Sequence, residues 1–119
     1  MSRIMLAVLT FTATCGAANA AVLYTPYVRV AVGEGVTCNV VNLSAQTRSF
    51  TLELVDGSGG SIQCSGTVPA GGARWCTWFS IATAPMNARY CRITVPDAAK
   101  ANMRGGISNE TTGVSFSAE

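Results

Sequence analysis

The sequence contains no histidine among its 119 residues. This absence excludes Ser-His-Asp and Cys-His catalysis, metal sites built on imidazole, and the usual proton shuttle near neutral pH. The acidic residues lie mostly in predicted turns or at the carboxyl terminus, whereas a glycosidase needs two carboxylates facing each other across a cleft. The glycine-rich run at 56–60 lacks the lysine and the helix of a phosphate-binding loop. The sequence therefore predicts a protein that is not an enzyme and that carries no cofactor.

Charged residues are also scarce, at 12% of the chain. Once Arg3 is set aside as part of the leader described below, seven basic residues face six acidic ones, which leaves a net charge of +1. The basic residues form no stripe along the sequence, and affinity for a nucleic-acid backbone depends on such a stripe. We therefore expect no nucleic acid among the partners.

Long hydrophobic runs are missing as well. The apolar stretch at 4–14 is interrupted by three threonines and is too short to span a bilayer. With Arg3 before it and the small-x-small triplet Ala18-Asn19-Ala20 after it, this stretch is typical of a secretory signal peptide. We expect residues 1–20 to be the signal peptide and residues 21–119 to form one soluble domain, without a membrane span, that is secreted or periplasmic.

Cys15 offers an alternative to this interpretation. A cysteine at the end of a leader is the lipidation site of a bacterial lipoprotein. The residues in front of it, Thr12-Ala13-Thr14, depart from the usual pattern, in which leucine comes first and glycine or alanine last. We therefore expect Cys15 to leave with the signal peptide.

What the chain does contain is a pattern of short strands. Helical periodicity is almost absent, and Val, Thr, Ile and aromatic residues are interrupted at short intervals by Gly, Pro, Asn and Asp. Seven or eight short strands within a single domain favour an all-β fold, an immunoglobulin-like β-sandwich, with a small barrel as the alternative. The expected strands cover residues 23–32, 36–43, 48–55, 61–68, 73–81, 89–95, 102–108 and 113–117.

Three segments carry a resemblance to a known group of proteins. They are Cys38-Asn39-Val40-Val41-Asn42, the strand and turn at 50–57, and the turn at 67–72. Together they resemble small extracytoplasmic bacterial domains of the adhesion-related, immunoglobulin-like kind, and they cover the larger part of residues 21–119. The resemblance implies a sandwich fold and an exported setting, and it carries over no catalytic or binding residue. The chain departs from antibody-type domains because Tyr90 directly precedes Cys91.

Four cysteines follow the leader, an even number that predicts two disulfides in an exported domain. Three pairings are possible. Cys38 and Cys91 each share a strand face with apolar neighbours, so we expect them to meet across the core. Cys64 and Cys76 lie at equal distances from the middle of the turn at 69–72, so a hairpin would place them opposite each other. A zinc site is disfavoured, because the chain has neither a Cys-x-x-Cys pair nor a histidine.

Two groups of residues are candidates for binding. If Cys91 points inward, Tyr90 and Arg92 point outward, and Glu53 and Arg104 could join them if their strands are neighbours. Tyrosine and arginine are favoured at interfaces. The alternative is a cross-strand Glu53–Arg92 ion pair that only solvates the sheet.

The tryptophans form the second group. Trp75 and Trp78 have opposite parity along a strand, so one is expected in the core and the other partly exposed. The exposed ring could stack on a sugar or a partner protein, or cover the edge of the sandwich.

The sequence thus predicts an exported, non-enzymatic module that binds a protein or glycan, or is a structural unit at the cell surface or in the periplasm. One alternative is a small secreted inhibitor of a protease or glycosidase that presents the loop at 69–74 or 82–89. Another is a fibre or pilus-like subunit that lends a strand to its neighbour. A complete set of strands argues against the fibre subunit.

Overall fold

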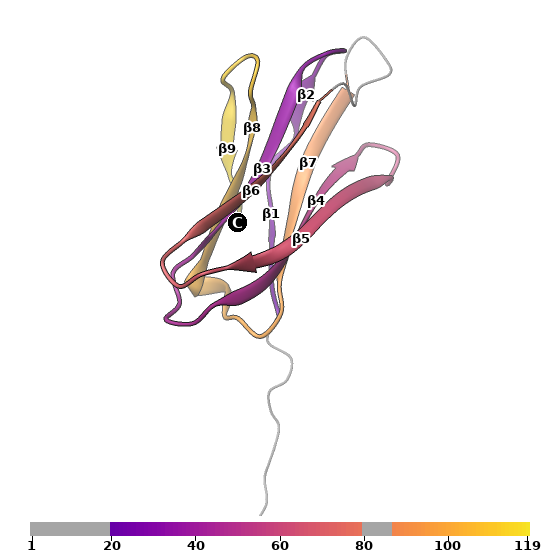
Figure 1. The fold of residues 1–119 in the computed structure, drawn as a ribbon. Helices are drawn as coiled ribbons and strands as arrows, with labels where there is room; N and C mark the ends of the chain where they lie inside the picture. Colours follow the sequence, from indigo (N-terminus) through magenta and orange to yellow (C-terminus); the bar gives the residue numbers. More distant parts are fainter. Residues whose placement is uncertain (1–19, 80–86) are drawn as a thin grey trace, which may run out of the picture.

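Two antiparallel sheets face each other in the computed structural model, which describes residues 20–79 and 87–119 (Figure 1). The first sheet consists of β1 (Ala21–Tyr24) and β2 (Val28–Val30), both paired with β7 (Asn87–Val95), then β4 (Arg48–Asp56) and the edge strand β5 (Ser61–Val68). The second sheet has the order β6 (Ala73–Phe79), β3 (Gly35–Asn42), β8 (Met103–Asn109) and β9 (Ser115–Ser117). A single 3₁₀ turn, Lys100–Asn102, precedes β8.

The expected all-β sandwich with two disulfides is confirmed. The described residues contain nine strands instead of seven or eight, because the first expected strand is divided into β1 and β2 around Pro26. Proline has no N–H to donate to a ladder and therefore interrupts a strand. The strand expected at 73–81 and the loop expected at 82–88 fall partly outside the described residues, and β7 begins at Asn87.

The core is built by alternating side chains from both sheets. Each of β3, β4 and β7 turns every second side chain inward, as strand geometry dictates. The inward residues predicted from this alternation are all buried: Val36, Cys38, Val40, Phe50, Leu52, Leu54, Cys91, Ile93 and Val95. The outward side chains of these strands therefore form two external faces, one on each sheet.

Both predicted disulfides are present, and each joins one sheet to the other. Cys38 of β3 and Cys91 of β7 are bridged through the fully buried centre, with their Cα atoms 5.9 Å apart. Cys64 of β5 and Cys76 of β6 are bridged at the side of the sandwich, with a Cα separation of 6.6 Å.

Cys64 and Cys76 are paired as predicted, but the hairpin on which this prediction depends does not form. The two strands β5 and β6 do not pair as a hairpin, because β5 is hydrogen-bonded to β4 and β6 is hydrogen-bonded to β3. The turn at 69–72 carries the chain from one sheet to the other, so the bridge links two adjacent sheet edges. In Figure 1, β5 and β6 diverge from this turn.

The opposite side of the sandwich is held by the end of the chain. The Tyr24 N–H donates to the Glu119 carbonyl and the Glu119 N–H donates to the Tyr24 carbonyl, each over 2.9 Å. The segment after β9 thereby connects the second sheet to β1 of the first. The two sheets are thus linked by one disulfide through the core, by a second disulfide on one side, and by backbone hydrogen bonds on the other side.

Candidate functional site

The outer face of the first sheet carries three of the four residues in the first predicted patch. Glu53 and Arg92 are register partners on β4 and β7. The Arg92 guanidinium donates to both carboxylate oxygens of Glu53, over 2.8 Å from Nε and 2.7 Å from Nη2. This bidentate contact lowers the pKa of Glu53 and raises the pKa of Arg92. The cross-strand pair thus engages two of the five N–H donors of Arg92 and fixes the orientation of its guanidinium.

Tyr90 belongs to a small aromatic cluster on the same face. Its ring centroid lies 6.4 Å from that of Tyr24 and 5.1 Å from that of Tyr27, the latter in an edge-on arrangement. Such geometry is typical of stabilising aromatic pairs. Tyr24 and Tyr27 were not singled out from the sequence, although each is about half exposed.

Arg104 does not belong to this patch. It lies on β8, which pairs with β3 and β9 in the second sheet, so the expected neighbourhood of its strand with β4 and β7 is wrong. Its guanidinium donates to the carbonyls of Ala101 and Met103, over 3.0 and 2.8 Å. The alternation of β8 indicated an outward side chain but could not indicate which sheet the strand would join.

The two tryptophans point in opposite directions, as their parity predicts. Trp78 is partly buried and packs against the core. Trp75 lies on the outer face of the second sheet, where its side chain is 66% exposed. Burial of a tryptophan in an interface removes a large apolar area from water. Because Trp75 is exposed, the outer face of the second sheet is a stronger candidate for a binding surface than that of the first.

An open depression of about 590 Å³ adjoins Trp75 on this face. We call it the Trp75 face. The described residues that line it come from β6, β3, β8 and the turn after β8: Trp75, Thr77, Phe79, Thr37, Asn39, Ser108 and Glu110. Six of these seven side chains are uncharged.

Strand register explains how these side chains come together. Trp75 is the partner of Asn39, Thr77 of Thr37, and Phe79 of Gly35. The Phe79 ring extends over Gly35, where an added Cβ would lie 2.5 Å from a ring carbon. Only glycine therefore permits this position of the ring.

The floor of the Trp75 face is partly organised by internal hydrogen bonds. The hydroxyls of Thr37 and Thr77 are 2.7 Å apart, and the Ser108 hydroxyl donates to the Glu110 carboxylate over 2.9 Å. Within residues 20–79 and 87–119, the Asn39 amide makes no side-chain hydrogen bond, and Asn39 is partly exposed. Among the described residues, none bonds to the N–H donors or the oxygen of this amide.

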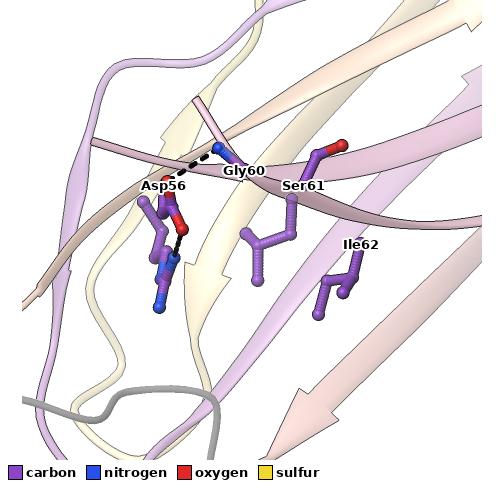
Figure 2. A pocket seen from close by; sticks show the side chains of 6 residues that line it. Asp56, Gly60, Ser61 and Ile62 are labelled. Atoms are coloured by element: carbon purple, nitrogen blue, oxygen red, sulfur yellow. Dashed lines mark hydrogen bonds and ion pairs between the residues drawn. The ribbon is translucent and has the colours of Figure 1, made fainter. Parts of the chain in front are cut away.

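A second depression, of about 330 Å³, surrounds the ion pair of Asp56 and Arg89 (Figure 2). One Asp56 oxygen lies 3.0 Å from Arg89 Nη1, and the other accepts from the Ser58 N–H, the Ser58 hydroxyl and the Gly60 N–H. Hydrogen bonds from Ser58, aided by Arg89 and Gly60, lower the pKa of Asp56 to about 2. Asp56 therefore stabilises the turn at 57–60 through these hydrogen bonds, a role typical of aspartate in such loops.

A third depression, of about 450 Å³ and mainly apolar, lies between the edges of β2 and β9. Tyr27 lies on one side of it, and Val114 and Phe116 lie on the other. The Glu34 carboxylate at its margin accepts from the Ala31 N–H and the Asn109 amide, and these bonds lower the pKa of Glu34. The acidic group is therefore part of the scaffold.

In residues 20–79 and 87–119, no three or more His, Cys, Asp or Glu side chains are grouped so as to hold a metal ion. No helix in these same ranges is long and apolar enough to cross a bilayer. Comparison with protein-family models, with curated proteins and with solved structures gives no significant match.

Proposed function

We propose that this chain is an exported, non-enzymatic binding module with an immunoglobulin-like scaffold, and that the Trp75 face is its binding surface. The observation that carries the proposal is the 66% exposed Trp75 side chain above an open, mostly uncharged depression. Two disulfides in a small domain are consistent with an oxidising compartment. Together with the leader at 1–20, they support export to the periplasm or the cell exterior.

Binding at the Trp75 face would cost little conformational entropy, because its backbone is already fixed by strand pairing. Its side chains project from paired strands of one sheet. Tryptophan has two side-chain torsions, so immobilising it costs less conformational entropy than immobilising a long flexible chain. The face on the first sheet is a weaker candidate, since Arg92 is held by Glu53 and Tyr90 by neighbouring rings.

The inhibitor alternative has less support in the geometry. An inhibitory loop must project to enter a hydrolase cleft. The turn at 69–72 is instead tight, with the Gly72 N–H donating to the Pro69 carbonyl and the Gly71 N–H donating to the Asn42 carbonyl. The other candidate loop, at 82–89, lies mostly outside the described residues.

The test of the proposal compares two aromatic variants of the oxidised domain 21–119. Fluorescently labelled wild-type domain is incubated with intact cells and extracellular matrix of the source organism, and retention is measured. Trp75→Ala should lose most of the saturable retention. Tyr24→Ala is the matched control, because it removes an exposed ring from the opposite face, and it should retain as much as the wild type.

Thermal unfolding of both variants establishes that the comparison concerns folded domains. Retention of Trp75→Ala at the wild-type level would contradict the proposal that the Trp75 face binds. Loss of retention in Tyr24→Ala alone would move the binding surface to the first sheet.

A further inference from the structure

We propose that the ligand of the Trp75 face is a neutral oligosaccharide, bound along β6. The proposal rests on the proposed binding function of this face and specifies its ligand class. Pyranose rings present faces of C–H groups, which pack on aromatic rings, and rims of hydroxyls, which form hydrogen bonds. The Trp75 face contains both kinds of partner within one depression.

The two aromatic side chains set the length of the ligand. Trp75 and Phe79 lie four residues apart on the same face of β6, and each is 66% exposed. Four residues of extended strand separate two Cα atoms by about 13 Å. A single pyranose ring is much shorter than this, so one sugar cannot contact both rings, whereas a chain of several sugars can. The face should therefore prefer oligosaccharides to monosaccharides.

Polar groups lie between and beside the two rings. Asn39 is the register partner of Trp75, and Thr77 lies between Trp75 and Phe79 along β6. An amide offers both a donor and an acceptor, which matches a sugar hydroxyl, itself both a donor and an acceptor. The amide of Asn39 has no internal hydrogen bond among the described residues, so a ligand hydroxyl need not displace one.

Charge decides between neutral and anionic ligands. Among the described residues lining the Trp75 face, Glu110 is the one charged residue, and it is acidic. An anionic polysaccharide or a nucleic acid would meet a carboxylate there with no cation lining the same depression, which is unfavourable. Apart from the two aromatic rings, the lining consists of hydroxyl, amide and carboxylate groups. A protein partner would more typically meet an apolar surface around its central anchor, so the observations favour a neutral sugar chain.

The experiment titrates the oxidised domain 21–119 with defined sugars by isothermal calorimetry. The probes are neutral hexasaccharides of β-1,4-linked glucose, β-1,4-linked N-acetylglucosamine, β-1,4-linked mannose and α-1,4-linked glucose, together with the corresponding monosaccharides. A heparin-derived hexasaccharide is the anionic comparison. At least one neutral hexasaccharide should bind, about tenfold or more tightly than its monosaccharide and more tightly than the heparin fragment.

Four variants assign the binding to this face. Trp75→Ala should weaken the hexasaccharide about tenfold or more, as expected for a central aromatic anchor. Trp75→Phe should restore part of the affinity, and Phe79→Ala should weaken the hexasaccharide while leaving the monosaccharide unchanged. Tyr24→Ala, on the opposite face, should bind as the wild type does.

Two results would overturn the saccharide assignment. One is the failure of every neutral hexasaccharide to bind, and the other is tighter binding of the heparin fragment. Wild-type affinity in Trp75→Ala would show that any sugar binds elsewhere. If no sugar binds, yet retention on cells depends on Trp75 and is abolished by protease treatment of those cells, the partner is a protein. The binding function would then stand and the ligand class would be wrong.

Discussion

Two asparagines on β3 differ in whether their side chains form hydrogen bonds within the domain. Asn42 is completely buried; its amide donates to the carbonyls of Gln46, Val68 and Pro69, and its oxygen accepts from Ser44. Asn39, on the same strand, is partly exposed and has no internal side-chain hydrogen bond within the described ranges. These two asparagines lie three positions apart on one strand. Asn42 is held by hydrogen bonds within the fold, whereas we propose that Asn39 contacts a ligand.

Replacing Asn42 by alanine should therefore be costly. The change leaves buried carbonyl groups without a donor, and an unsatisfied buried group costs about 1–3 kcal/mol. We expect Asn42→Ala to lower the free energy of unfolding by about 2 kcal/mol or more, measured by urea denaturation. Asn39→Ala is the matched control and should stay within about 0.5 kcal/mol of the wild type. Equal effects of the two changes would contradict the hydrogen-bond roles described above.

Acid stability should depend on Asp56. Its pKa is lowered from 3.8 to about 2 in the folded domain, so the ionised form stabilises the fold at neutral pH. This contribution is complete above the ordinary pKa and is lost as the pH falls through the folded value. The lowered pKa values of Glu34 and Glu53 act in the same direction.

The measurement is thermal unfolding as a function of pH. The melting temperature of the wild type should change little between about pH 5 and 8, since no histidine titrates there. It should fall steeply between about pH 4 and 2. Asp56→Asn should melt lower at neutral pH and show a shallower fall in acid. An acid slope identical to that of the wild type would show that Asp56 contributes nothing through its charge.

At the scale of strands, much of the fold could be predicted because alternation reports which side chains face inward. Leu52, Ile93 and Cys38 follow from this pattern and are completely buried. Alternation does not report which sheet a strand joins. For this reason the sequence allows a hairpin of β5 and β6 and a position of Arg104 beside β7, and neither is found, because β6 and β8 both pair with β3. The exposed position of one tryptophan was predictable from parity, but the surrounding depression depends on the pairing of β3 with both β6 and β8.

The two disulfides should stabilise different parts of the sandwich. The bridged residues are separated by 53 positions for Cys38–Cys91 and by 12 for Cys64–Cys76. Loop entropy predicts roughly 4 kcal/mol for the first bridge and roughly 3 kcal/mol for the second. The first also lies in the buried core, so its removal adds a cavity cost.

Paired alanine variants test this order. Cys38→Ala with Cys91→Ala should lower the free energy of unfolding more than Cys64→Ala with Cys76→Ala, measured by chemical denaturation. The second pair should also speed hydrogen exchange most in β5 and β6, because Val68 is the one residue of β5 that is buried. A larger loss from the second pair would mean that the edge bridge, and not the central one, limits stability.

At the scale of the whole molecule, the sequence predicts export more clearly than it predicts a binding partner. The signal peptide expected at 1–20 predicts export, and the two disulfides are consistent with it, but neither feature indicates a ligand. We expect the intact mass of the exported protein to correspond to residues 21–119 with two disulfides. A lipid-modified species beginning at Cys15 would contradict cleavage after Ala20 and would indicate a membrane-anchored protein.

The most direct test of the Trp75 face uses nuclear magnetic resonance of the oxidised domain. The two indole N–H signals report separately on Trp75, which is exposed, and on Trp78, which packs against the core. The neutral hexasaccharide that binds most tightly in calorimetry is titrated into the labelled domain. We predict that the Trp75 indole signal and the amides of β3 and β6 shift, while Tyr24 and Tyr90 do not. Shifts confined to the first sheet, with an unchanged Trp75 signal, would contradict the assignment of the binding surface.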